Sequence, residues 1–356
     1  MTARPAPAPA PAPAPPASTV AIHAQLMLRV LLDERARPSL DGVDWELMER
    51  VARHHTVIVR VTDRFMASGV APRMLVRAAV EERARGHSML AVLQHIQSNA
   101  ARHGLAWMAP KALQRFPDVG DDVDVLVFSD NSATDRLVFE GLPATRQEPS
   151  LTARVAANTL YSIATGGDPA SALVFDVRHG RVGSAGQHAA FAKTLDRNAR
   201  AVIMGGTEFR IPSVEDQLVL QGLEKVTGRR SFHLCDVVQT IEILRTPELD
   251  WDYVVATARS HGGLEGLGCY LSYVDFVNER LLGTALLPAQ IRRRFAPGKW
   301  GYPSVREKGF YFPALQVTGR IQGRQLGRSL VRGDWDAALR LTLWPLAAIT
   351  ERVRGS

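Results

Sequence analysis

The stretch DVGDDVDVLVF (118–128) places four aspartates within seven residues and then continues directly into an apolar run. Burying a carboxylate is costly unless it is paired. VDVLVF (123–128) has the pattern of a strand that is buried on both faces. Because side chains alternate along a strand, Asp122 and Asp124 would share one face, and Asp121 would point to the other. Two neighbouring carboxylates on one buried face therefore need a partner.

A divalent cation is one such partner. Without it, one of the two carboxylates would have to take up a proton. Mg²⁺ prefers a few carboxylates together with substrate phosphates and water. ALVFDVRH (172–179) is a second strand of the buried type, and its Asp176 would complete a site for two metal ions. Asp-x-Asp alone is a weak motif, and Asp118 and Asp121 fit the preceding turn.

The pattern along the chain predicts an α+β fold, in which a small mixed-sheet core is flanked by helical segments. We divide the chain into a disordered Pro/Ala leader, an N-terminal helical segment, the core, a C-terminal helical segment and a basic tail. Their boundaries are 1–19, 20–104, 105–211, 212–290 and 291–356. Helical periodicity dominates the two helical segments, whereas short apolar runs dominate the core.

Local signals refine this division. A long helical pattern runs from Pro72, which suits a first helical position, to His103, and Gly104 fits its stop. AVIMGGTEFRI (201–211) predicts a hairpin that turns on Gly205-Gly206, and Ser213 predicts the cap of the next helix. TVIVRVTDRFM (56–66) fits either a helix or a strand.

Composition excludes several classes of protein. The two cysteines, Cys235 and Cys269, have no metal-ligand spacing, which argues against a zinc site or a disulfide framework and fits a reducing cytoplasm. No apolar run reaches the length of a membrane span, so we expect none. The leader has no hydrophobic centre and is not a signal peptide. G-x-S-x-G, P-loop and H-E-x-x-H motifs are absent.

The net charge of +7 is unevenly placed. Residues 292–356 hold 13 basic against 4 acidic residues, whereas the rest of the chain is slightly acidic. This surplus would suit an anionic partner. Only five of the 43 basic residues are lysine, however, and that bias indicates a GC-rich, bacterial genome equally well.

MAPKALQRFPDVGDDVDVLVF (108–128) resembles the core of the uncharacterised nucleotidyltransferase family within the DNA polymerase beta superfamily. That family shows a Lys-Gly, a Tyr-Pro-like segment and then Asp-Ile-Asp-Leu-Leu-Val. Lys111, Phe116-Pro117 and residues 122–127 hold those places here. Helical blocks on both sides extend the resemblance to about residues 40–290, roughly two thirds of the chain.

The resemblance implies metal-dependent transfer of a nucleoside monophosphate from an NTP, for which we expect ATP, to an acceptor such as a small molecule, peptide or protein. Asp122 and Asp124 would hold Mg²⁺ or Mn²⁺. Asp176 would share one metal ion and help to deprotonate the acceptor, and Lys111 would contact the phosphates. Two departures, Ala112 in place of glycine and Arg178 in place of histidine, leave a catalytically silent binding module as the first alternative. The second alternative is a nucleic-acid-binding protein that uses the basic tail.

Other candidate sites have simpler interpretations. His54-His55 and the group His233, Cys235 and Asp236 fit packing better than metal binding. GGLEGLG (262–268) follows a helix rather than a strand, so a helix–helix turn is favoured over a nucleotide loop. RRRFAPGKWGYPSVREKGFYF (292–312) suits nucleic acid in composition, but packing on the domain is favoured. WDAALRLTLWPLAAITERV (335–353) is partly amphipathic and broken at Pro345, and closing the fold is favoured for it over contact with a membrane surface.

Overall fold

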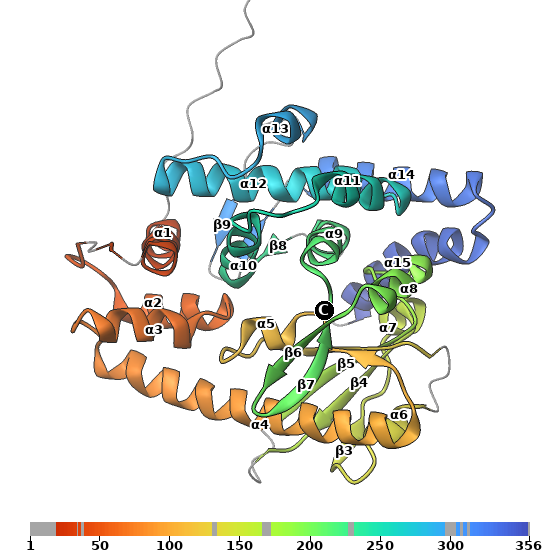
Figure 1. The fold of residues 1–356 in the computed structure, drawn as a ribbon, viewed down its shortest axis with the longest axis horizontal. Helices are drawn as coiled ribbons and strands as arrows, with labels where there is room; N and C mark the ends of the chain where they lie inside the picture. The colour runs from red at the N-terminus through yellow and green to blue at the C-terminus, as the bar shows by residue number, and fades with distance from the viewer. Residues whose placement is uncertain are drawn as a thin grey trace, which may run out of the picture.

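A computed structural model describes residues 19–354, except 34, 37–38, 130–133, 166–171, 227–230, 296–303, 307–308 and 312–313. The predicted leader lies outside the described residues, apart from Thr19, which begins the first helix. Helices surround a small mixed sheet, which confirms the α+β class (Figure 1). Within the described part of the chain, no helix has the length and apolar character to cross a membrane.

Four helices precede the sheet: α1 (Thr19–Leu32), α2 (Trp45–His54), α3 (Ile58–Ala67) and α4 (Arg73–His103). The ambiguous stretch 56–66 is thus mostly helical. Asp44 caps α2, because its carboxylate accepts the N–H of Leu47 at 3.0 Å. As predicted, α4 ends at Gly104, which has a φ of 63°.

The sheet has five strands in the order β1-β2-β5-β4-β3. These are β1 (Trp107–Met108), β2 (Val123–Val127), β3 (Ala144–Arg146), β4 (Asn158–Ile163) and β5 (Leu173–His179). The central strands β2 and β5 run parallel, and the other pairs are antiparallel. Every residue of β2 is buried, as its sequence predicted.

Short elements connect or follow these strands: α5 (Ala112–Arg115), α6 (Thr134–Val138), α7 (Leu151–Ala156), α8 (Ala189–Arg197), β6 (Arg200–Met204) and β7 (Thr207–Ile211). The last two form the predicted hairpin. Gly205 and Gly206 make its turn with φ values of 56° and 77°, a conformation that glycine adopts readily.

Five helices follow: α9 (Val214–Glu224), α10 (Leu234–Leu244), α11 (Trp251–Ser260), α12 (Leu264–Leu282) and α13 (Ala289–Phe295). In Figure 1, α9 and α10 lie between the sheet and α12. Ser213 caps α9 as predicted, since its hydroxyl accepts the N–H of Asp216 at 3.1 Å. α9 approaches α12 closely at Gly222, where a Cβ atom would lie 2.6 Å from the Cα of Leu267. Only glycine fits there.

The two faces of the sheet meet different layers. Val123, Val125 and Phe175 point to one face and share a core with Leu93 and Ile96 of α4, the long helix beneath the sheet in Figure 1. Residues of the opposite face belong to the larger core, which includes most of the other helices. The face that carries Asp124 is therefore turned toward the C-terminal helices.

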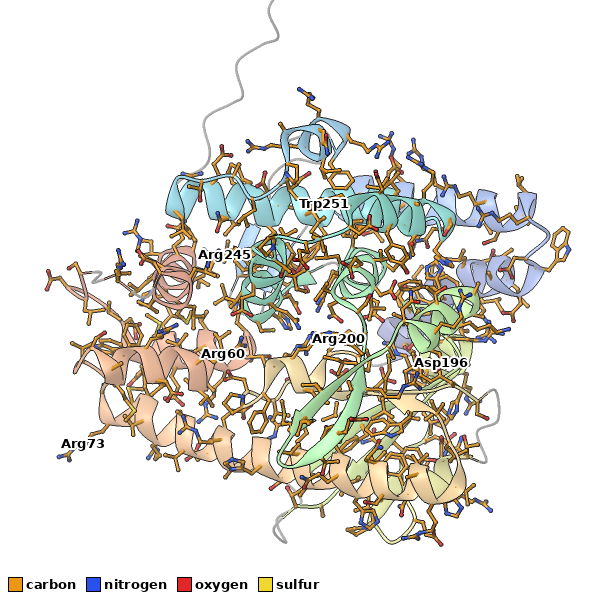
Figure 2. The ribbon with its side chains drawn as sticks, viewed as in Figure 1. Arg60, Arg73, Asp196, Arg200, Arg245 and Trp251 are labelled. Carbon is orange, nitrogen blue, oxygen red and sulfur yellow. The ribbon has the colours of Figure 1, made fainter. Side chains whose placement is uncertain are left out.

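The loop before β2 is tied to the N-terminal helices through Asp118. Its carboxylate accepts the N–H of Val59 at 2.7 Å and a guanidinium N–H of Arg60 at 2.8 Å. Arg60 is labelled in Figure 2. Asp118 is fully buried at the start of α3, where the positive end of the helix dipole favours a carboxylate. Asp118 thus anchors this loop in addition to shaping it.

Much of the segment predicted as a basic tail is built into the fold. β9 (Ser304–Arg306) and β10 (Gly309–Tyr311) form a three-stranded sheet with β8 (Ser231–Phe232). Phe310 stacks on Phe232 with ring centroids 4.8 Å apart. In α14 (Ala314–Val331), Val317 and Ile321 join the larger core. The described residues of segment 292–312 therefore pack on the domain, as we predicted from the sequence.

The last helix, α15 (Trp335–Arg354), continues through Pro345, so the break predicted there is wrong. Contacts with α7 hold the helix on both sides of the proline. Arg340 donates to the carbonyl of Val155, and Glu351 accepts both the N–H and the hydroxyl of Thr152, each at 2.9 Å. These contacts keep the helix in line despite the N–H that proline lacks.

Arg292 shows how the basic segment is held. Its Nε lies 2.9 Å from Oδ2 of Asp275, which is 1% exposed, and it also pairs with Glu279. The other oxygen of Asp275 accepts the N–H groups of Leu286 and Leu287 at 2.7 and 3.1 Å. Asp275 therefore joins α12, α13 and the loop between them.

We expect Arg292→Gln to lower the free energy of unfolding by about 1–3 kcal/mol, because a buried carboxylate loses its cation. Arg293→Gln is the matched control, since Arg293 is exposed on the same helix. Urea unfolding of both variants measures the difference. Equal stabilities would mean that the ion pair contributes nothing.

Candidate active site

The register of the parallel strands places Asp124 of β2 directly beside Asp176 of β5. Asp122 stands just before β2 and, two residues from Asp124, lies on the same face. Arg178 shares this face on β5 and is paired in register with Asn158 of β4. The sheet thus brings the three aspartates singled out in the sequence to one face.

Lys111 precedes α5 and extends to the same face. Its Nζ lies 3.1 Å from Oδ1 of Asp124 and 2.5 Å from Oε2 of Glu224, the last residue of α9. Lys111 is 5% exposed, so both pairs are shielded from water. A buried ammonium group requires such partners. The lysine expected to contact phosphate is therefore held between two carboxylates.

Arg178 contacts three carboxylates. Its guanidinium group lies 2.8 Å from Glu224, 3.3 Å from Asp176 and 3.8 Å from Asp124. Asn158 adds a hydrogen bond at 2.8 Å to the other oxygen of Asp176. The residue that departs from the family's histidine is thus the electrostatic centre of this cluster.

The pKa values of Asp176 and Glu224 are shifted in opposite directions by this environment. Burial raises the pKa of Asp176; Arg178 works against the rise, while Asp124 and Asp122 add to it. Burial would also raise the pKa of Glu224, but Lys111 and Arg178 outweigh it and lower that pKa. Glu224 therefore serves as the counterion, and Asp176 is the carboxylate that holds a proton most readily.

Sequence reasoning missed Glu224 and Asn158 as members of this cluster. Glu224 lies 46 residues from Arg178, its ion-pair partner, in a stretch whose helical pattern indicated scaffold. One signal was present. Gln217, Gln221 and Glu224 recur at helical spacing and are separated by apolar residues and Gly222, so they form a polar stripe on α9.

This polar stripe is buried beside the cluster. Gln217 accepts a hydrogen bond from Gln114 of the α5 turn at 3.3 Å, and Gln239 of α10 donates to Gln114. Gln221 is 1% exposed, and neither atom of its amide has a hydrogen-bond partner among the described residues. A buried amide of this kind is costly. The interface between α5, α9 and α10 is therefore polar enough to bind a polar ligand.

A second group satisfies the distance criterion for metal binding better than the aspartates do. Among the described residues, His233, Cys235 and Asp236 are the group that brings three potential ligand atoms within 4.8 Å of one another. Asp236, however, is fully buried between Lys225, at 2.7 Å, and Arg115, at 3.1 Å. Burial also raises the pKa of the Cys235 thiol. This group is a neutralised structural cluster.

The remaining histidine and glycine candidates also have structural roles. His55 is buried, and its Nδ1 accepts the N–H of Leu234 at 3.0 Å. Gly262, with a φ of 74°, and Gly263 form the turn between α11 and α12, and α12 begins at the next residue. Only the first part of GGLEGLG is therefore a turn.

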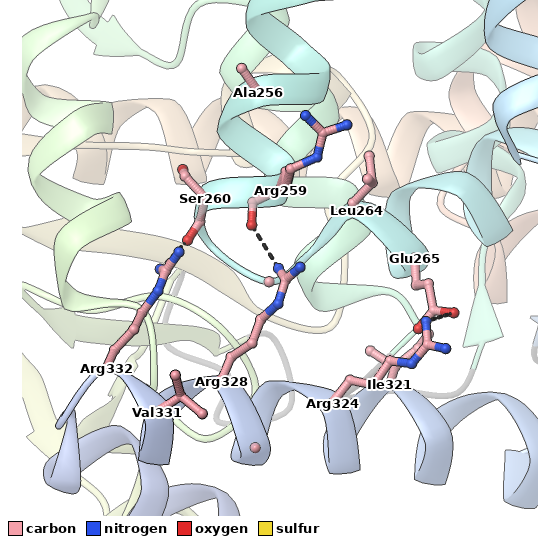
Figure 3. A pocket seen from close by; sticks show the side chains of 12 residues that line it. Ala256, Arg259, Ser260, Leu264, Glu265, Ile321, Arg324, Arg328, Val331 and Arg332 are labelled. Carbon is pink, nitrogen blue, oxygen red and sulfur yellow. Dashed lines mark hydrogen bonds and ion pairs between the residues drawn. The ribbon is translucent and has the colours of Figure 1, made fainter.

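A hollow of about 910 Å³ lies away from the aspartates, between α14 and the α11–α12 turn (Figure 3). Arg324 and Arg328 extend into it from α14, and Arg332 extends into it from the residue after the end of that helix. Arg328 donates to the carbonyl of Arg259 at 2.7 Å, Arg332 donates to that of Ser260, and Arg324 pairs with a glutamate of α12. Arg328 and Arg332 thus stabilise the C-terminal end of α11.

Comparison with protein-family models, with curated proteins and with solved structures finds no match for this chain. The nucleotidyltransferase resemblance therefore depends on the motif and on the arrangement of Asp122, Asp124, Asp176 and Lys111.

We expect Asp122→Asn and Asp124→Asn to differ in stability. Asp124→Asn takes one carboxylate from the buried Lys111 and should lower the free energy of unfolding by about 1–3 kcal/mol. Asp122→Asn removes a charge that repels Asp176 but attracts Arg178 and Arg115, so the two effects oppose each other and we expect a smaller loss than for Asp124→Asn. Urea unfolding in EDTA compares the two, and a larger loss for Asp122→Asn would contradict the assigned ion pairs.

Asp176 predicts a pH dependence. Because its pKa is raised in the folded protein, its contribution to stability is present at low pH and is lost as pH rises through that pKa. Asp176→Asn removes this loss. The stability of the variant relative to the wild type should therefore increase between about pH 4 and pH 7. Thermal melts in EDTA test this, and a constant difference would mean that the Asp176 pKa is not raised.

Proposed function

We propose that the chain transfers a nucleoside monophosphate from an NTP to an acceptor, using Mg²⁺ or Mn²⁺. The observation that supports this most directly is the placement of Asp122, Asp124 and Asp176 on one face of two adjacent parallel strands. Three carboxylates side by side with a buried lysine suit phosphoryl chemistry, which depends on positioning and charge neutralisation. The sequence motif supplies the link to the nucleotidyltransferase family.

The donor set has the chemistry that a divalent cation takes, but its carboxylates would have to draw closer together to share one ion. Asp124, Asp176 and Glu224 are now paired with the cations Lys111 and Arg178, and buried Arg115 also acts on Asp122 and Asp124. Carboxylate oxygens are the ligands that Mg²⁺ prefers. The three aspartates would hold the metal, which would neutralise triphosphate charge and polarise the reacting oxygen when bound. Arg178 would then have to release Asp176.

The chain's own residues would divide the remaining work. Asp176, whose pKa is raised by burial, is the carboxylate best suited to accept a proton from the acceptor's nucleophile. Asn158 fixes the orientation of that carboxylate. Lys111 would exchange a carboxylate for a phosphate oxygen, and Glu224 would remain as the counterion of Arg178.

One observation favours the alternative of a catalytically silent binding module. Arg178 contacts three of the carboxylates and could serve permanently in place of a metal ion. The other alternative, nucleic-acid binding through the basic segment, gains no such support. Arg292 and the arginines of the α14 pocket already have protein partners.

Calorimetric titration of ATP, with and without Mg²⁺, tests the proposal. We expect Mg²⁺-dependent binding that Asp124→Asn reduces at least tenfold and Lys111→Ala weakens by roughly 1.5–3 kcal/mol. Asp121→Asn is the matched control, because Asp121 is an exposed neighbour on the loop. Absence of ATP binding under both conditions would contradict the proposal.

Transfer itself is measured with ATP labelled on the α-phosphate, incubated with the wild-type chain and with extracts of small molecules or proteins as acceptors. Label that moves to an acceptor, with pyrophosphate released, identifies an enzyme. Mg²⁺-dependent ATP binding without transfer or pyrophosphate release would instead favour the silent module.

A further inference from the structure

The outer face of α15 carries a row of large apolar side chains that are exposed. Trp335, Leu339, Leu346, Ile349 and Val353 are 70%, 58%, 58%, 62% and 70% exposed. Isolated exposed hydrophobic residues are ordinary, but a contiguous row of them marks an interaction surface. The row extends along nearly the whole helix, from the first residue of α15 to the residue before its last.

The spacing of this row is that of a coiled-coil seam. Together with Thr342, the five residues stand at positions 335, 339, 342, 346, 349 and 353, so their steps alternate between four and three. This is the a/d repeat of a heptad, which keeps one narrow stripe facing a second helix. The stripe contains no charged residue and is about 27 Å long, at 1.5 Å for each residue.

The opposite face of α15 is already occupied, which fixes the direction in which the seam points. Ala337, Ala338 and Leu341 are buried against the domain. The charged residues Arg340 and Glu351 turn inward to α7, where they bind backbone and side-chain groups. The interpretation that this helix closes the fold therefore accounts for one face only.

We propose that this seam pairs with the same seam of a second copy of the chain, with the two α15 helices antiparallel. A twofold axis near residue 344 then matches every seam position with another. Trp335 meets the partner's Val353, Leu339 meets the partner's Ile349, and Thr342 meets the partner's Leu346. Each layer joins an a position to a d position, and the largest residue meets the smallest apolar one. Such self-complementarity is what a twofold interface requires.

The size and chemistry of the seam favour this partner over a lipid surface. Its five apolar residues and the adjacent Leu343 expose on the order of 600 Å² in each copy, close to the roughly 800 Å² that each partner buries in a standard interface. Helices that lie on anionic membranes carry Lys and Arg beside the apolar face. Over residues 335–351 of α15 the one basic residue is Arg340, which faces the domain instead.

Sedimentation velocity over a range of concentrations tests the dimer. We expect the wild-type chain to form dimers in the micromolar range, and Leu346→Asp to weaken dimerisation at least tenfold. Ile203→Asp is the matched control, because Ile203 is an equally exposed apolar residue (74%) on the β6–β7 hairpin and should leave the dimer intact. Far-UV circular dichroism verifies that each variant is folded.

Single-cysteine variants test the antiparallel register. Cys235 and Cys269 are both buried and should not interfere. A mixture of Trp335→Cys and Val353→Cys chains should form a cross-linked dimer on oxidation, whereas Trp335→Cys alone should not.

Three results would overturn the proposal. The first is a wild-type chain that stays monomeric up to about 100 µM. The second is efficient cross-linking of Trp335→Cys to itself, which requires a parallel pair. The third is a monomer that binds phosphatidylglycerol vesicles through Leu346, which would assign the seam to a membrane surface.

Discussion

Two buried cations, Lys111 and Arg178, join the sheet to the helices above it through shared carboxylates. Lys111 connects Asp124 of β2 with Glu224 of α9, and Arg178 connects the same glutamate with Asp176 of β5. Removing one member of such a buried pair is far more costly than never having had the pair, because its partner stays charged and desolvated. The position of α9 over the sheet is therefore coupled to the charge state of the cluster.

Because of this coupling, the ion-pair network of the cluster and the proposed metal and nucleotide site would compete for the same side chains. As an ion-pair network it is most stable when Arg178 and Lys111 keep their carboxylates. As a metal and nucleotide site it must give some of those carboxylates to a divalent cation and release its own cations to phosphate. Because Lys111 also holds Glu224, a phosphate that takes Lys111 would leave Glu224 of α9 paired with Arg178 alone. Ligand binding and the packing of the C-terminal helices would thus change together.

Features that depend on residues close together in the sequence could be predicted, whereas features that depend on contacts between distant segments could not. β2, β5, the hairpin at Gly205-Gly206 and the cap at Ser213 depend on local patterns, and the sequence predicted each of them. The shared face of Asp122 and Asp124 could be predicted because the alternation of side chains along one strand is also local. The role of Glu224 could not be predicted, since it arises only when α9 crosses the sheet. The helix break predicted at Pro345 was wrong for a similar reason, because contacts with α7 keep the helix continuous.

The buried face of α9 supports a functional reading of this interface over a purely structural one. A helix that only had to cover the sheet could be apolar there, and a well-packed apolar replacement for a buried polar network is often neutral or stabilising. Instead, Gln217, Gln221 and Glu224 form a stripe, and the Gln221 amide has no hydrogen-bond partner among the described residues. Departures from local consistency of this kind are expected where a site needs them. The face of α9 beside the cluster thus keeps a hydrogen-bonding character that packing against the sheet alone does not require.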